Sequence, residues 1–275
     1  MNQIIGFVGS GNMASSLIGG LLSCDIEGIN GEQILVFDPS TDKVDALVEK
    51  FDVRRANDNE SLVLESDVVV IAVKPQAMQS VLQPLGGAFR ESSALIVSIV
   101  AGITSASIEA WLQAPCAIAR VMPNTPALVG SGASGMYANK RVTDSQRATT
   151  ETLMNAVGLS VWVNSEDDID TVTALSGSGP AYFMLFIQSL VDAAMQAGLE
   201  ETAAKTLAVQ TAMGAAELVC ASDQSIQTLI DNVTSPGGTT EQALLSFNQS
   251  NLKQAVRDAF DAAKHRSQEL ARELA

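Results

Sequence analysis

The residues best suited to bind a nucleotide stand at the start of the chain. Gly9, Gly11 and Ala14 form the pattern G-x-G-x-x-A, directly after an apolar run and at the start of a helical pattern. In such a turn the first glycine permits a tight bend, the second lets a pyrophosphate approach, and the small third residue lets helix and strand pack closely. The free N–H groups of the helix start face the phosphates. This predicts a dinucleotide site, the alternative being a glycine-rich turn that binds nothing.

The second apolar run ends at an acidic residue, Asp38. A carboxylate at this place usually accepts the ribose hydroxyls of NAD and repels the 2′-phosphate of NADP. Ser40, Thr41 and Lys43 follow, however, and could bind a 2′-phosphate if the carboxylate turned away. Asp38 could equally serve only as a turn former ahead of Pro39. The choice between the two dinucleotides therefore stays open.

Further segments are expected at the same edge, because the carboxyl ends of strands in a doubly wound sheet line the ligand crevice. Lys74, within Ala72–Pro75, is expected beside the cofactor phosphates or ribose, although elsewhere it would be an ordinary solvated lysine. Asn59 is either a cofactor residue or only a helix cap. The segments Ala101–Gly102 and Met122–Pro126 are compatible with backbone that lines a nicotinamide pocket.

Two glycine-rich segments in the second half read as helix starts, Ser176–Pro180 and Thr234–Thr240. Exposed N–H groups and several hydroxyls would let each bind a carboxylate without arginine or lysine. Serine and proline are also ordinary capping residues, so a single segment of this kind needs no ligand. Two of them, attached to a dinucleotide-binding region, favour a substrate pocket.

The chain carries little machinery for acid–base catalysis. His265 is the only histidine and lies in a charged stretch, so a Ser-His-Asp or Cys-His arrangement is not expected. We expect no metal, because no cluster has ligand spacing. A nicotinamide cofactor with hydroxyl groups but no obvious acid suits hydride transfer to an electrophile that already carries its proton, such as an iminium.

Composition narrows the class of protein. The 275 residues are 47% apolar and 17% charged, which suits about two domains with a sizeable core. The net charge of −15 argues against a nucleic acid or an anionic membrane as partner. Three cysteines without a C-x-x-C pair indicate free thiols in a reducing compartment. Without a signal-peptide pattern, we expect a soluble cytoplasmic protein.

The pattern of apolar runs predicts an α/β fold, a Rossmann-like doubly wound sheet followed by an all-helical domain. A dinucleotide-binding domain is expected over residues 1–164, and a helical substrate-binding and dimerisation domain over 165–275. The predicted strands are 4–8, 34–37, 68–73, 95–100 and 117–121, with 133–137 and 159–163 at one edge. The predicted helices of this part are 12–23, 41–51, 76–85, 105–112 and 144–157.

The helical half favours a dimer. Residues 180–197 are apolar nearly all round, which predicts a buried helix. The last segment carries a narrow apolar seam that suits a partner helix; its residues are Leu252, Val256, Ala259, Ala263, Ser267, Leu270 and Leu274. We expect two chains to complete each other's bundle, although a self-contained helical domain would also fit.

Five segments together resemble the pyrroline-5-carboxylate reductases, which reduce a cyclic imino acid to L-proline with NAD(P)H. They are Gly6–Ala14, Ala72–Pro75, Met122–Pro126, Leu175–Tyr182 and Asp231–Thr240, and they extend over nearly the whole chain. The first segment is shared by many reductases, whereas the last is close to a family signature. The resemblance implies an intertwined homodimer, often assembled as a ring of five dimers into a decamer.

The resemblance also implies roles for individual residues. Thr240 would be catalytic, with its hydroxyl near the ring nitrogen of the substrate. Substrate-binding residues would be Glu166, from the partner chain, together with Asn232, Ser235, Gly237, Gly238 and Thr239. The cofactor residues expected from motif and resemblance are Gly6, Phe7, Val8, Gly9, Ser10, Gly11, Asn12, Met13, Asp38, Ser40, Asn59, Ala72, Val73, Lys74 and Pro75. The resemblance implies NADPH as the cofactor. Because NADP-preferring relatives often carry a neutral residue in place of Asp38, NADH stays the alternative.

Two rival functions remain on the sequence alone. A β-hydroxyacid dehydrogenase of similar build would need a lysine in the helical half, and Lys205 is the only candidate ahead of the terminal helix. A nicotinamide-binding sensor would need a partner surface but no carboxylate site.

Overall fold

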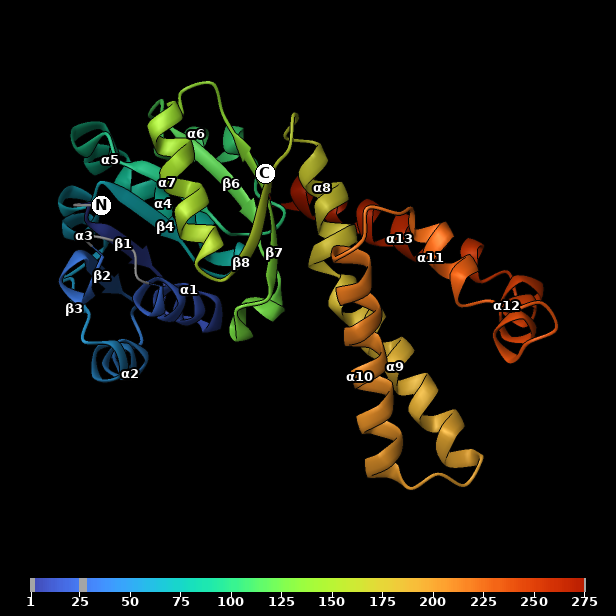
Figure 1. Ribbon diagram of the computed structural model, residues 1–275. Coiled ribbons are helices and arrows are strands. Elements are labelled where there is room, and N and C mark those ends of the chain that lie inside the picture. Colours follow the sequence, from blue (N-terminus) through green and yellow to red (C-terminus); the bar gives the residue numbers. More distant parts are fainter. Residues whose placement is uncertain (1–2, 25–28, 275) are drawn as a thin grey trace. The chain divides into compact units, whose positions relative to one another are not determined.

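The computed structural model describes residues 3–24 and 29–274 of the chain (Figure 1). Two compact units are present, and each is described by itself. The first comprises the residues up to Ser178 together with the stretch from Ala263 onward, and the second is Gly179–Ala262. The last strand ends at Trp162, beside the predicted change from strands to helices at residue 164. The first unit extends further because the helix after this strand packs on the sheet, where Gly135 leaves room for Val172.

The first unit is built on an eight-stranded sheet with the order β3-β2-β1-β4-β5-β6-β7-β8 (Figure 1). Neighbouring strands are parallel except for β6 and β7, which are antiparallel. The strands are β1 Ile5–Val8, β2 Ile34–Phe37, β3 Arg54–Arg55, β4 Val68–Ile71, β5 Leu95–Ser98, β6 Ile118–Met122, β7 Gly132–Ala138 and β8 Gly158–Trp162. The predicted Rossmann-like sheet is therefore confirmed.

Helices cover both faces of this sheet. The α-helices of the nucleotide-binding region are α1 Asn12–Ser23, α2 Thr41–Phe51, α3 Asn59–Glu65, α4 Met78–Leu82, α5 Gly86–Ser92, α6 Ser105–Leu112 and α7 Asp144–Asn155. Short 3₁₀ turns occur at η1 Gly31–Gln33, η2 Pro75–Ala77, η3 Gln83–Leu85 and η4 Thr125–Val129. The predicted helix over 76–85 is split among η2, α4 and η3, because Pro84 cannot supply an N–H in mid-helix.

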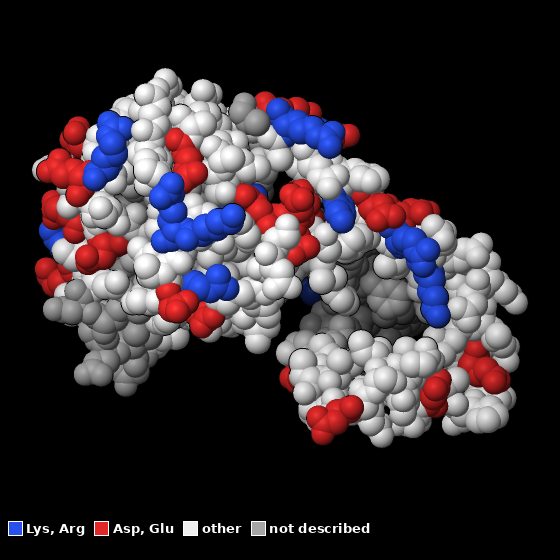
Figure 2. Space-filling model, turned by 90° about the horizontal axis from the view of Figure 1, so that it is seen from above, with Lys and Arg blue, Asp and Glu red and all other residues white. Residues whose placement is uncertain are grey.

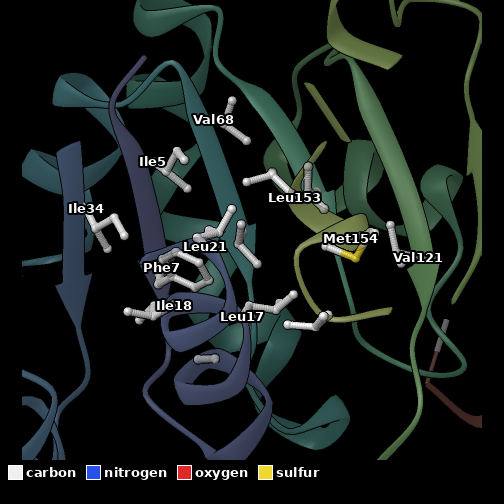
Figure 3. Close-up of a cluster of buried hydrophobic side chains, with 14 of the residues drawn as sticks. Ile5, Phe7, Leu17, Ile18, Leu21, Ile34, Val68, Val121, Leu153 and Met154 are labelled. Carbon is white, nitrogen blue, oxygen red and sulfur yellow. The ribbon is translucent and has the colours of Figure 1, made fainter. Parts of the chain in front are cut away.

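Alternating residues of the strands feed two separate cores. On one face, Ile5 and Phe7 of β1 pack with Leu17 and Leu21 of α1, as Figure 3 shows. On the other face, Val8 packs with Leu62 and residues of α4 to α6. All four residues of β4 are buried, as expected of a parallel strand that is covered on both sides.

Three elements of the first unit were not predicted: β3, α3 and α5. β3 is only two residues long, and its Arg54–Arg55 sequence carries no apolar signal. The start of α3 is marked by a capping box in which Asp58 accepts from the Ser61 amide, a signal that sequence reasoning assigned instead to Asn59. Asn59 is the first helical residue, so the prediction that it could be the cap is wrong.

The second unit contains only helices among its residues (Figure 1). They are α9 Gly179–Gln196, α10 Glu201–Cys220, α11 Ile226–Asn232, α12 Thr239–Gln249 and the first part of α13 Leu252–Glu273. Within one chain α9 is not buried, since Phe183 is 72% exposed and Leu185 69% exposed. The predicted apolar seam of α13 is shared between the two units. Val256 belongs to the second unit and is exposed, whereas Ser267 belongs to the first unit and is buried.

The two leucines of α3 provide a matched test of the core. Leu62 is completely buried, whereas Leu64 in the same helix is 42% exposed. We expect Leu62→Ala to lower the free energy of unfolding by about 2–5 kcal/mol, because it leaves a cavity under the sheet. Leu64→Ala is expected to change it by about 0.5 kcal/mol or less. Urea unfolding of both variants measures the difference, and equal losses would contradict this packing.

Candidate functional site

Most of the predicted cofactor residues of the first unit lie at one edge of the sheet, whereas Gly6, Phe7 and Val8 lie within β1 and are buried. Because β2, β1, β4 and β5 are parallel neighbours, the segments that follow them emerge side by side. These segments hold the glycine turn, Asp38 and Ala72–Pro75, and Ser98 ends β5 at the same edge. The start of α3 lies at the same edge, because α3 follows the parallel strand β3.

The glycine turn has the geometry that its sequence predicts. Gly9 has a φ of +100°, and a Cβ there would lie 2.7 Å from the carbonyl oxygen of Ala72. Its N–H donates to the carbonyl of Phe37 at 2.9 Å, which ties the turn to β2. Gly11 caps α1 without a side-chain hydrogen bond, and a Cβ on Gly11 would meet nothing within 4 Å. The helix start is thus open to a phosphate.

Asp38 links two turns of the backbone. Its Oδ2 accepts the N–H of Ser10 at 3.0 Å, and its Oδ1 accepts the N–H of Ser40 at 2.8 Å. Burial alone would raise the pKa of the Asp38 carboxyl, but these hydrogen bonds from Ser40 and Ser10, with the positive charge of Lys43, hold the pKa below its usual range. The carboxylate is therefore more than a turn former before Pro39, because it also fixes the glycine turn.

Three buried polar atoms at this edge have no protein partner among the described residues. They are the hydroxyl of Ser10 in the glycine turn, Oδ1 of Asn59, and the hydroxyl of Ser98, the last residue of β5. Buried polar atoms are almost always hydrogen-bonded, so three such atoms at one edge are suited to a polar ligand. Lys74 is the exposed cap of η2 and follows β4, and Ala72 of the same segment donates its N–H to the Val8 carbonyl of β1. These residues fit a bound dinucleotide.

Glu166 is held inside its own unit. Its Oε1 accepts the N–H of Ser105 at 2.6 Å and the guanidinium of Arg120 at 2.9 Å, while its Oε2 accepts the Ser105 hydroxyl at 2.7 Å. Arg120 comes from β6 and is buried. Sequence reasoning missed Arg120, although an arginine between apolar residues of a predicted strand could have drawn attention to a buried partner.

The segment Ser176–Pro180 is not a helix start, so that prediction is wrong. α8 Asp168–Val172, the π-helical η5 Thr173–Gly177 and α9 form one helix over 168–196. The N–H of Ser178 donates to the carbonyl of Thr173 at 2.8 Å, five residues back. No free helix start exists here to bind a carboxylate, because the helix continues through the segment. By length and composition alone this helix could cross a membrane.

The segment Thr234–Thr240 does precede a helix start, in the second unit. Gly238 caps α12 without a side-chain hydrogen bond, and Gly237 has a φ of +72°. The N–H of Gly237 donates to the Glu241 carboxylate at 2.9 Å. Thr240 lies half-buried in the first turn.

The other predicted substrate residues lie close to this start in the sequence. Thr239 is the first residue of α12, and Ser235 accepts the N–H of Gly238 through its carbonyl at 2.9 Å. Asn232 ends α11 and donates to Gln224 at 3.1 Å. Glu166 belongs to the first unit, so the structure does not bring it together with these residues within a unit.

No group of three or more His, Cys, Asp or Glu among residues 3–24 and 29–274 is arranged to hold a metal ion. Acidic and basic side chains on the face drawn in Figure 2 occur in small groups, many of them beside each other. The cofactor edge described above combines backbone N–H groups and neutral polar side chains with two charged residues, Asp38 and Lys74.

The glycine turn at a doubly wound sheet, followed by a helical unit, defines a two-domain oxidoreductase of the nicotinamide-dinucleotide class. The pyrroline-5-carboxylate reductase of Pseudomonas aeruginosa is 46% identical over 270 residues, which are 98% of this chain and 97% of the relative. The chain belongs to the pyrroline-5-carboxylate reductase family.

Solved structures and family profiles agree with this assignment. A pyrroline-5-carboxylate reductase from Coxiella burnetii has a TM-score of 0.93 and 42% identity, covering 98% of this chain and 99% of that chain. The pyrroline carboxylate reductase of Plasmodium falciparum with NADP bound has a TM-score of 0.86 and 35% identity, covering 98% of both chains. The profile "Pyrroline-5-carboxylate reductase dimerisation" matches residues 166–270, and "NADP oxidoreductase coenzyme F420-dependent" matches 4–102.

The two glycines of the turn should respond differently to alanine. Gly11→Ala is expected to leave the melting temperature nearly unchanged but to weaken NADPH binding about tenfold or more, because the new methyl group enters the space left for the ligand. Gly9→Ala is expected to lower the melting temperature as well, because its positive φ and the Ala72 carbonyl reject a Cβ. Calorimetry and NADPH titration separate the two effects, and a Gly11→Ala variant that binds normally would refute the site.

Proposed function

We propose that this protein reduces 1-pyrroline-5-carboxylate to L-proline by hydride transfer from NADPH, the final step of proline biosynthesis. The observation that carries the proposal is the start of α12, whose cap Gly238 makes no side-chain hydrogen bond, in a chain whose relatives are pyrroline-5-carboxylate reductases. NADPH supplies the hydride when it is bound. The chain's own contribution is to hold both reactants, exclude water and orient the imine.

The start of α12 would bind the carboxylate of the substrate. Backbone N–H groups at a helix start favour an anion through hydrogen bonds and the helix dipole, without a basic side chain. The N–H of Gly237 already donates to a carboxylate, that of Glu241, so this amide is oriented to meet such a group. We propose that Ser235, Gly237, Gly238 and Thr239 hold the substrate carboxylate, with Asn232 beside them.

Thr240 would act on the ring nitrogen. An iminium already carries its proton, so the Thr240 hydroxyl has to orient and polarise the C=N bond rather than supply a strong acid. Glu166 of the partner chain would close the pocket, and its Oε2 accepts only one of the three hydrogen bonds that this carboxylate receives within its own unit. Its hold on Ser105 and Arg120 would keep the carboxylate in a fixed place.

The cofactor site would comprise the predicted residues at the edge of the sheet. Gly6 to Gly11 would hold the pyrophosphate, with Asn12 and Met13 next to them at the start of α1. Ser40 and its neighbour Asp38 would hold the adenosine ribose, and Asn59 with Ala72 to Pro75 the remainder. NADP is favoured because a relative binds it and because one family profile describes an NADP oxidoreductase. NADH is the alternative, since a carboxylate lies at the end of β2.

A second copy of the chain would cover the apolar surface of the helical unit. Large side chains of α9 and α10 are exposed in the single chain, among them Phe183, Leu185, Leu207 and Met213. Exposed apolar surface of this kind marks an interface, and the dimerisation profile spans these helices. We propose a homodimer, with the decamer of five dimers as a further assembly, in the cytoplasm and without a nucleic acid or membrane partner.

The proposed reaction is tested by following the oxidation of NADPH at 340 nm in the presence of pyrroline-5-carboxylate, with L-proline identified as the product. A β-hydroxyacid offered with NADP is the control for the dehydrogenase alternative. Turnover of the imine and not of the β-hydroxyacid is expected, and NADPH binding without any turnover would leave only a sensor.

Thr240 should matter for the chemical step more than for cofactor binding. Thr240→Ala is expected to lower kcat/KM by about 10²-fold, the scale of a lost polarising group, while NADPH affinity changes less than about twofold. Thr240→Ser keeps the hydroxyl and should retain most of the activity. Thr206→Ala, at an exposed site in α10, serves as the control. Equal losses of kcat/KM and of NADPH affinity would remove this role.

Asp38→Ser should shift the preference between cofactors toward NADPH. The substitution removes the negative charge that would repel a 2′-phosphate, while it also removes the acceptor for the Ser10 and Ser40 amides. We therefore expect weaker binding of both dinucleotides. The ratio of kcat/KM with NADPH to kcat/KM with NADH should rise about tenfold over that of the unsubstituted protein. An unchanged ratio would mean that the carboxylate acts only on the two turns.

A further inference from the structure

Pro180 leaves one carbonyl of the long helix without its usual partner. The carbonyl of Ser176 would accept the N–H of the residue four positions on, but that residue is Pro180 and has no N–H. The proline ring also crowds this carbonyl. Both effects coincide with the π-helical η5, which ends at Gly177. π-helical turns are frequent at functional sites.

A buried amide supplies the missing partner. Nδ2 of Asn124 donates to the carbonyl of Ser176 at 2.9 Å, and Oδ1 of the same side chain accepts the N–H of Ala133 at 2.9 Å. Asn124 is only 8% exposed. A Cβ on Gly177 would lie 2.7 Å from the Met122 side chain, so the π-helical turn and the loop after β6 also approach closely.

This loop follows β6 at the carboxyl edge of the sheet, next to β5. In a doubly wound sheet the dinucleotide runs across this edge from the adenosine end at β2, so the nicotinamide end lies toward β5 and β6. The Asn124 side chain points into the protein, toward Ser176 and Ala133, and therefore fixes the loop from behind.

From this arrangement we infer that Asn124 is a positioning residue for hydride transfer. Asn124 ties the loop after β6, which faces the nicotinamide, to the π-helical turn. This turn lies immediately before the second unit, which begins at Gly179. The inference rests on the proposed function. Because hydride transfer is sensitive to displacements of about 1 Å, loosening this bridge should slow the chemical step more than it weakens binding.

A second asparagine offers a matched control. Asn139 bridges backbone groups in the same way, since its Nδ2 donates to the Cys116 carbonyl at 2.9 Å and its Oδ1 accepts the Ile118 N–H at 3.2 Å. This bridge lies at the start of β6, the opposite edge of the sheet from the cofactor.

The test compares Asn124→Asp with Asn139→Asp. Aspartate keeps an oxygen for the backbone N–H but sets another oxygen against the carbonyl. We expect Asn124→Asp to lower kcat about tenfold or more, with the Kd of NADPH and the KM of the imine within about twofold. Asn139→Asp should lower the melting temperature similarly and leave kcat within about twofold. If kcat fell in both variants, and only as far as the melting temperature fell, the inference would be overturned.

Pro180→Ala provides an independent check, because it restores the N–H that Ser176 lacks. In the Asn124→Asp background this change should recover part of kcat, as expected for two sites that share one carbonyl. Absence of any coupling between the two substitutions would contradict the bridge.

Failure of the proposed function would be recognised separately, because the unsubstituted protein would then not reduce the imine. In that case hydrogen exchange decides the matter. Asn124→Asp should speed exchange over residues 122–134 and 173–182, whereas Asn139→Asp should not. Unchanged exchange in Asn124→Asp would overturn the bridge.

Discussion

The close approach of Gly9 to the carbonyl of Ala72 determines where a ligand can bind. With a φ of +100° and 2.7 Å between the Cβ position and that oxygen, only glycine lets β1 turn into α1 beside the end of β4. The turn is tied to β2 as well, through the Phe37 carbonyl and the Asp38 carboxylate. Three neighbouring strand ends are thereby locked together, and the start of α1 is left open.

The chemistry of both binding regions follows from a shortage of positive charge. A chain with a net charge of −15 has no general attraction for a phosphate or a carboxylate. Both helix starts, at Gly11 and at Gly238, have caps without a side-chain hydrogen bond. Backbone amides at a helix start favour an anion, and beside Gly238 the amide of Gly237 already donates to a carboxylate, that of Glu241. Such short-range binding selects ligands by shape, which suits an enzyme that must place two small reactants precisely.

The sequence predicted the periodic elements well and the irregular ones poorly. The strands of the sheet, and helices such as Asn12–Ser23 and Thr41–Phe51, carry strong apolar patterns, and their bounds match the structure closely. Ser176–Pro180 was misread because glycine, serine and proline mark a helix start and a π-helical turn alike. What separates the two is the Asn124 amide, which comes from a distant loop and cannot be inferred from local spacing.

The candidate site shows the same limit. The glycine turn and the segment before α12 could be predicted because their residues are contiguous, and a helix start can be read from its own sequence. Arg120 could not be paired with Glu166 from the sequence, since only the tertiary fold brings β6 beside the segment that precedes α8. The exposure of α9 was also beyond reach, because an all-round apolar helix looks the same whether its own chain or a second copy covers it.

The final turns of α13 give the helical unit an unusual connectivity. Ser267 donates to Asp170 at 2.6 Å, and Leu274 packs against the core beneath the sheet, so the chain returns to the unit from which it departed. The helical unit is thus topologically an insertion with two covalent crossings, rather than an appendage on a single tether. Because both crossings belong to the nucleotide-binding scaffold, the helices between them can diversify while the scaffold keeps both anchor points.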